Sequence, residues 1–202
     1  MLETYKKALW LEYFTVGYNV AEGVVSVLVG YLTGSVALVG FGLDSGIESL
    51  SGAVLIWRLT RHGKVSKEEE ERVEALSVKL VGVSFLLLGG YVLYGAITKL
   101  WLGERPDPTL FGIAIAVASI IIMPLLARAK GRCAEEISSD ALKADSRQTW
   151  LCSILSAALI VGLGLNYLYG LWWADPVSAI VISGFIFREA YSTLKSKKLC
   201  CC

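Results

Sequence analysis

Two acidic residues, Asp44 and Glu48, stand four positions apart in an otherwise apolar segment, residues 35–59. On an α-helix this spacing places both carboxyl groups on one face, with β-carbons about 6 Å apart. Two carboxylates this close in a low-dielectric medium cannot both stay ionised unless a cation lies between them. The pair therefore binds a divalent metal ion or shares a proton. Two protonated acids hydrogen-bonded to neighbouring helices remain the structural alternative.

A second polar group occupies residues 140–165, where Asp145, Gln148 and Cys152 follow one helical face. If this helix runs antiparallel to the helix that carries Asp44 and Glu48, Glu48 lies level with Gln148 and Asp44 level with Cys152. These four side chains could then close around one ion, with Asp145 near the cytoplasmic mouth as a substitute ligand. Otherwise Gln148 makes an interhelical hydrogen bond and Cys152 is a small buried apolar residue.

The first apolar segment, residues 9–31, adds Asn19 and Glu22 on one face. Glu22 lies about 14 Å from the outer end of the segment, which is deep in the bilayer. We expect this pair to serve the ion path or a proton relay, the alternative being a protonated structural acid. Glu12 lies near the inner end, where its side chain is expected to reach the interface.

Composition requires these side chains to be held by membrane-spanning helices. Of the 202 residues, 55% are hydrophobic and only 18% are charged, and residues 80–98, 108–127 and 148–174 carry no charge at all. A bilayer core of about 30 Å needs about 20 helical residues. A soluble enzyme, a disordered chain and a small disulfide-stapled domain are therefore excluded. The net charge of +1 argues against a nucleic-acid partner.

The predicted fold class is an all-α integral membrane bundle of six helices. The expected segments cover residues 9–31, 35–59, 78–102, 109–128, 140–165 and 175–193. Asp175 and Pro176 are typical of a helix start and should cap the sixth segment. Seventeen of the nineteen lysines and arginines fall on one side of this arrangement. Lys130 is one of them and is assigned to the loop after the fourth segment. The positive-inside rule then places both termini in the cytoplasm, in the cell membrane if the source is prokaryotic.

Little of the chain is left for other domains. We expect a cytoplasmic amino terminus at residues 1–8, the transmembrane domain at 9–195 and a Cys-rich cytoplasmic tail at 196–202. The acidic run at residues 68–71 is interpreted as a solvated part of a cytoplasmic loop. The glycines of residues 78–102 are interpreted as internal helix-packing positions. No nucleophile–base motif is present, so an enzyme is not expected, and paired acids on one helix suit an intramembrane hydrolase poorly.

The order of these motifs resembles the cation diffusion facilitator (cation efflux) family. Members carry a GSxAL-like turn before the second helix, a four-spaced polar pair within it, and an Ala-Asp motif followed by a second pair on the fifth helix. The corresponding stretches here are Gly34–Leu38, Asp44 with Glu48, Ala144-Asp145, and Gln148 with Cys152. Trp173–Pro176 is similar to the start of the family's sixth helix. The usual histidine and aspartate of the fifth helix are replaced by Gln148 and Cys152.

The resemblance implies proton-coupled efflux of a divalent transition metal, often zinc, usually by a homodimer. Its usual carboxyl-terminal cytoplasmic domain is expected to be missing, because the chain ends shortly after the sixth segment. A site with the Cys152 thiolate suits Zn²⁺ or Cd²⁺, and an all-oxygen site suits Mn²⁺ or another harder ion; Fe²⁺ and Co²⁺ are further candidates. Metal binding releases ligand protons, which is the basis expected for antiport. The alternative is a membrane protein that binds a metal without transporting it.

Overall fold

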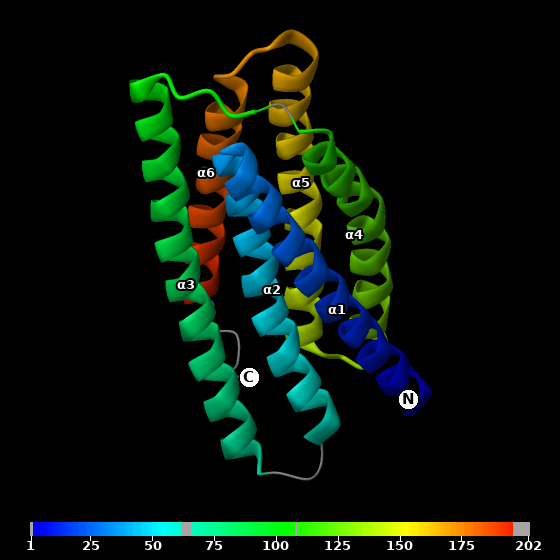
Figure 1. Cartoon of the computed structure of the whole chain (residues 1–202). Helices are drawn as coiled ribbons and strands as arrows, with labels where there is room; N and C mark the ends of the chain where they lie inside the picture. The colour runs from blue at the N-terminus through cyan, green and yellow to red at the C-terminus, as the bar shows by residue number, and fades with distance from the viewer. Residues whose placement is uncertain (1, 62–65, 108, 196–202) are drawn as a thin grey trace.

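The computed structural model describes residues 2–61, 66–107 and 109–195, and six long helices account for most of them (Figure 1). The helices are α1 (Leu2–Thr33), α2 (Val36–Arg61), α3 (Lys67–Leu102), α4 (Leu110–Glu136), α5 (Asp140–Tyr169) and α6 (Ala174–Lys195). Each contains a stretch that is long and apolar enough to cross a membrane. The all-α six-helix prediction is confirmed, and the helices are longer than predicted at most ends.

The side chains are distributed as in a protein solvated by lipid. Leu28, Leu87 and Leu125 on three different helices are more than half exposed. Fully buried positions include Asn19 and Thr149, together with a series of serines along the helix contacts. Polar groups are costly in hydrocarbon and therefore face the interior of a bundle, whereas apolar side chains can face lipid tails. The chain is a multi-pass integral membrane protein.

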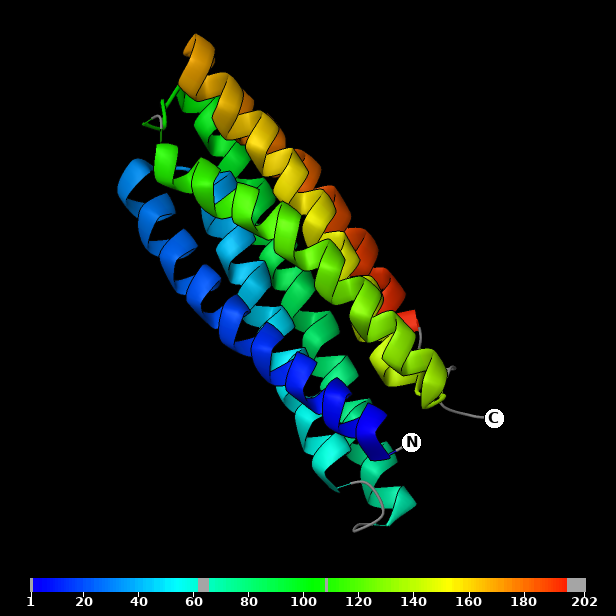
Figure 2. The same ribbon diagram turned by 90° about the vertical axis from the view of Figure 1, so that its right-hand side faces the viewer.

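The helices pack as three close pairs, α1 with α2, α4 with α5, and α3 with α6 (Figures 1 and 2). α2 also contacts α3, α5 and α6, so it is the most central helix of the bundle. α5 contacts α2, α4 and α6. A polar side chain on the inner face of α2 or α5 can therefore meet groups from several other helices.

Close packing of α3 on α6 depends on two of the glycines predicted to serve helix packing, whereas a β-carbon at Gly90 would meet nothing within 4 Å. A β-carbon at Gly82 would lie 2.6 Å from the Leu194 side chain, and one at Gly89 would lie 2.9 Å from the ring of Phe187. Small residues allow helix backbones to approach each other in lipid, where interhelical attraction depends on packing. These two glycines serve contacts within the chain.

Two predicted loop assignments are wrong. The acidic run at residues 68–71 is helical, because Ser66 caps α3 by accepting a hydrogen bond from the backbone amide of Glu69. α4 continues to Glu136, so Lys130 lies inside a helix and is completely buried rather than in a cytoplasmic loop. Residues 62–65 and the Cys-rich tail predicted at residues 196–202 lie outside the described residues.

Asp175 acts on a different helix from the one expected. α6 already begins at Ala174, and the Asp175 carboxylate accepts hydrogen bonds from the Ser35 hydroxyl and from the backbone amide of Val36. Ser35 in turn accepts from the backbone amide of Leu38. Asp175 therefore satisfies the exposed amides at the start of α2. This contact fixes the starts of α2 and α6 at the same end of the bundle.

Candidate metal site

Helix α2 places both predicted acids inside the bundle. Asp44 is 7% exposed and Glu48 is 2% exposed. The Glu48 Oε1 atom accepts a hydrogen bond of 2.8 Å from the Thr149 hydroxyl on α5. Its other oxygen, Oε2, has no hydrogen-bond partner among the described residues. Thr149 therefore orients the carboxyl group and leaves one oxygen free to bind an ion.

Asp44 is the less compensated of the two acids. Within the part of the chain that the structure describes, no side chain donates a hydrogen bond to its carboxyl group or forms an ion pair with it. The charged groups that act on it are Glu48, Glu189 and Glu22, all of them acidic. A buried carboxylate surrounded by other acids can stay ionised only if a cation binds nearby. Asp44 is therefore the strongest single candidate for an ion ligand.

Helix α5 brings the other predicted residues to the same region. Cys152 is buried, carries a free thiol and interacts electrostatically with Glu48, Glu22 and Asp44. Gln148 lines a cavity together with Asp44. Glu48 meets α5 at Thr149, one residue from the Gln148 level expected for an antiparallel pair. Asp44 shares its cavity with Gln148, and Glu48 is bound by Thr149.

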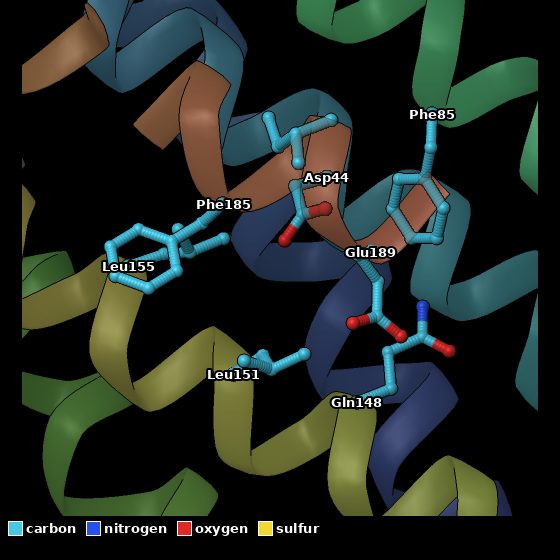
Figure 3. A pocket seen from close by; sticks show the side chains of 8 residues that line it. Asp44, Phe85, Gln148, Leu151, Leu155, Phe185 and Glu189 are labelled. Atoms are coloured by element: carbon cyan, nitrogen blue, oxygen red, sulfur yellow. The ribbon is translucent and has the colours of Figure 1, made fainter. Parts of the chain in front are cut away.

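Figure 3 shows this cavity between α2, α3, α5 and α6. Its polar lining residues are Asp44, Gln148 and Glu189. Its apolar lining residues are Phe85, Leu151, Leu155, Phe185 and Ile186. The volume of about 20 Å³ is enough for one water molecule or a small ion. Apolar walls around three polar groups give a region of low dielectric constant, in which charge attraction is strong.

Glu189 was missed as a site residue by the sequence analysis. It follows the apolar stretch Phe185–Phe187 and adjoins Arg188, which is typical of a helix end near the interface. The available signal was its helical spacing from Ile182 and Ile186, seven and three residues earlier. Both isoleucines are fully buried, so the same face of α6 carries Glu189 toward the interior.

Asp145 lies in a different cluster from Asp44. Its Oδ2 atom is 2.5 Å from Lys130 Nζ, and the same ammonium group is 3.1 Å from the Glu12 carboxylate. We call Glu12, Lys130 and Asp145 the lysine triad. It joins α1, α4 and α5, and its side chains are at most 4% exposed. The expectation that Glu12 reaches the interface is wrong, because Lys130 supplies its counter-charge inside the bundle.

The predicted relay residues lie next to the α2 acids. Glu22 accepts hydrogen bonds from the Tyr18 hydroxyl at 3.1 Å and from the Ser45 hydroxyl at 2.9 Å. Ser45 is the chain neighbour of Asp44, so Glu22 is connected to the acidic region through one side chain. Asn19 is completely buried, and neither amide atom has a hydrogen-bond partner among the described residues.

The candidate ligands are not assembled around a single point in this conformation. Across residues 2–61, 66–107 and 109–195, no three His, Cys, Asp or Glu side chains lie close enough together to hold a metal ion. Asp44 and Gln148 line the cavity, whereas Glu48 is bound by Thr149. A small rotation of α2 against α5, or a change of side-chain rotamers, would be needed to bring both α2 acids and Cys152 onto one ion.

The sequence matches the model of the cation efflux transmembrane domain over residues 14–199, which is most of the chain and includes most of α1 and all of α2 to α6. The chain belongs to the cation efflux family. Members of this family similar to it include an uncharacterized transporter of Synechocystis, 28% identical over 181 residues. That alignment covers 83% of this chain and 58% of the relative.

Two further relatives carry more informative names. The magnetosome protein MamB of Paramagnetospirillum magneticum is 28% identical over 165 residues, or 80% of this chain and 55% of the relative. The manganese efflux system protein MneS of Bacillus subtilis is 22% identical over 175 residues, or 85% of this chain and 60% of the relative. The chain thus spans somewhat more than half the length of these relatives. Of the buried acids described above, all except Glu12 lie within the residues that match the family model.

Proposed function

We propose that this protein exports divalent transition-metal ions across a membrane, through a midplane site formed by Asp44 and Glu48 of α2 with Cys152 and Gln148 of α5. One observation carries the proposal. Asp44 is buried among other acids and has no counter-charge among the described residues. A transported cation supplies that charge when it binds and removes it when it leaves. Membership of the cation efflux family supports the same function.

The cargo that we propose is Zn²⁺, because a thiolate from Cys152 beside two carboxylates suits tetrahedral zinc. If Cys152 does not bind the metal, the remaining ligands are all oxygen atoms and favour Mn²⁺, the ion in the name of the Bacillus relative. Flux of both ions should be compared in the wild type and in Cys152→Ser. Loss of zinc flux with retained manganese flux would show that the thiol is a ligand. Equal flux of both ions in both proteins would contradict a role for Cys152.

Transport is proposed to be coupled to protons and to use alternating access, with both termini in the cytoplasm. The acids must lose protons to bind a metal, so metal uptake by the site and proton release are linked. Glu22 and Asn19 are proposed to pass protons between Asp44 and the far side, because Ser45 joins Glu22 to the α2 acids. Asp145 is proposed to act in the ion path only after separating from Lys130.

The test is metal flux into vesicles that contain the purified protein, with and without a pH gradient. Asp44→Asn keeps the size of the side chain but removes its charge, and Glu135→Gln, an exposed acid on α4, is the matched control. We expect Asp44→Asn and Asp44→Ala to abolish flux, and the control to leave it unchanged. Metal binding without flux in the wild type would favour the non-transporting alternative. Metal flux that is the same with and without the pH gradient would contradict proton coupling.

A homodimer is part of the proposal on the basis of the family resemblance. Mass measurement of the detergent-solubilised protein, corrected for bound detergent, distinguishes one copy from two. A mass that corresponds to one copy at all concentrations, with full activity in vesicles, would contradict the dimer.

A further inference from the structure

Glu189 brings a carboxyl group from α6 to the cavity that Asp44 lines. It is half-buried, its exposed chain neighbour Arg188 acts on its charge, and it interacts electrostatically with Asp44. Figure 3 shows the Glu189 carboxyl group and the Gln148 amide on the same side of the cavity, with Asp44 across from them. Three polar groups from α2, α5 and α6 therefore share one small volume with apolar walls.

Two of these three polar groups, Asp44 and the Gln148 amide nitrogen, lack hydrogen-bond partners among the described residues. Asp44 is 93% buried and receives no hydrogen bond from a described residue, although it borders the cavity. The buried Gln148 Nε2 atom also has no acceptor among the residues that the structure describes. Native proteins rarely leave buried polar atoms without a partner, and a bound ion or water molecule often supplies it. Rotation of the Gln148 amide would present its oxygen to the cavity.

The backbone positions of Asp44 and Glu189 lie at different depths along their helices. α2 and α6 begin at the same end of the bundle, where Asp175 binds the Val36 amide. Asp44 is eight residues after Val36 and Glu189 is fifteen residues after Ala174. At 1.5 Å per residue these positions are about 12 Å and about 22 Å from the helix starts. Glu189 is therefore closer than Asp44 to the end at which α1 begins and α6 ends.

We propose that Glu189, the Gln148 amide oxygen and Asp44 form an access site that holds a divalent cation before it reaches Asp44 and Glu48. This inference rests on the proposed function. Its ligands are all oxygen atoms, and the cavity has room for the ion or a water molecule. Such a set suits divalent cations that prefer oxygen ligands. The cation would then exchange Glu189 for Glu48 while Asp44 remains bound.

The proposal predicts that α6 takes part in ion capture, which the α2 and α5 ligands alone would not require. An ion held between Asp44 and Glu189 links α6 to α2, and the link is lost when the ion moves to Glu48. Mn²⁺ is the appropriate probe, because it binds oxygen ligands and is detected directly by electron paramagnetic resonance.

The experiment measures Mn²⁺ flux into vesicles and Mn²⁺ binding for the wild type, Glu189→Gln, Glu189→Asp and the Glu135→Gln control. Removal of one carboxylate ligand should raise the half-saturating Mn²⁺ concentration of Glu189→Gln by about tenfold with little change in the maximal rate. Glu189→Asp should restore part of the affinity. A merely structural role would instead reduce the amount of folded protein and the maximal rate, without changing half-saturation.

The outcomes separate this inference from the proposed function. If Asp44→Asn abolishes flux while Glu189→Gln has wild-type half-saturation, the access site is wrong and the exporter proposal stands. If Asp44→Asn retains flux, the proposed function fails, whatever Glu189 does. If Glu189→Gln does not fold, Glu189→Asp decides, because an unchanged half-saturation in that shorter acid would overturn the inference.

Discussion

Two buried acidic regions of this protein differ in how their charge is balanced. In the lysine triad, Glu12 and Asp145 both contact the ammonium group of Lys130. Around Asp44, the charged groups that act on the carboxylate are all acidic. The first region has an internal counter-charge and joins α1, α4 and α5. The second has none among the described residues and lines a cavity. Internal pairing is typical of a structural contact, and its absence is typical of an ion site.

The regions are also neighbours, because α5 contributes to both. Lys130 and Asp145 both act electrostatically on Glu48. Asp145 and Thr149 are one helical turn apart, and the Thr149 hydroxyl contacts both the Asp145 carbonyl oxygen and the Glu48 carboxylate. A rearrangement of the triad would therefore be transmitted to Glu48 through one turn of α5. Metal binding and the packing of α1 and α4 against α5 are expected to influence each other.

The largest effect is expected from removing the charge of Asp44. Asp44→Asn should reduce metal flux to background and raise thermal stability in metal-free buffer, because it removes an uncompensated buried acid. Flux assays and melting of the detergent-solubilised protein test both effects. If Asp44→Asn loses stability as well as flux, Asp44 has a structural partner. The difference in charge balance between the Asp44 region and the lysine triad would then not hold.

Removing a charge from the lysine triad should lower the stability of the protein, whereas removing the charge of Asp44 should raise it. Lys130→Met leaves two buried acids without their counter-charge and should destabilise the protein by about 3–5 kcal/mol. The triple variant with Glu12→Gln and Asp145→Asn removes all three charges and should recover most of that stability. The measurement is the unfolding midpoint of each variant. If Lys130→Met is as stable as the wild type, the triad does not hold α1, α4 and α5 together.

A smaller effect is expected at the junction of the two regions. Thr149→Val keeps the shape of the side chain but removes the hydrogen bond to Glu48, which should cost about 1 kcal/mol of stability. Flux should fall severalfold, because the Glu48 carboxyl group loses its orientation. Thr149→Ser retains the hydroxyl group and is the matched control. Equal flux in Thr149→Val and Thr149→Ser would show that orientation of Glu48 is unimportant.

The sequence predicted what depends on local spacing. Six apolar segments have the right length to span a bilayer, and the four-residue interval places Asp44 and Glu48 on one face of a single helix. Both inferences require only the geometry of one helix. The inference that this face points into the bundle followed from the free-energy cost of exposing two acids to lipid.

The sequence could not predict contacts that depend on which helices are neighbours. Lys130 and Glu12 are 118 residues apart, and a lysine near a predicted segment end was interpreted as a loop residue. Asp175 was expected to cap α6, whereas the approach of α2 provided amides that it binds instead. Glu189 was overlooked because Arg188 and the following lysines suggested an exposed helix end. In each case tertiary packing determined which partner the charged group found.

The most direct test of the account is a structure of the protein with bound Zn²⁺ or Mn²⁺, in which anomalous scattering locates the metal. We expect an anomalous peak bound by an Asp44 carboxylate oxygen, with Glu48 or Glu189 as a further ligand. A metal bound elsewhere in a transport-competent protein, with Asp44 and Glu48 both free of it, would contradict the central claim.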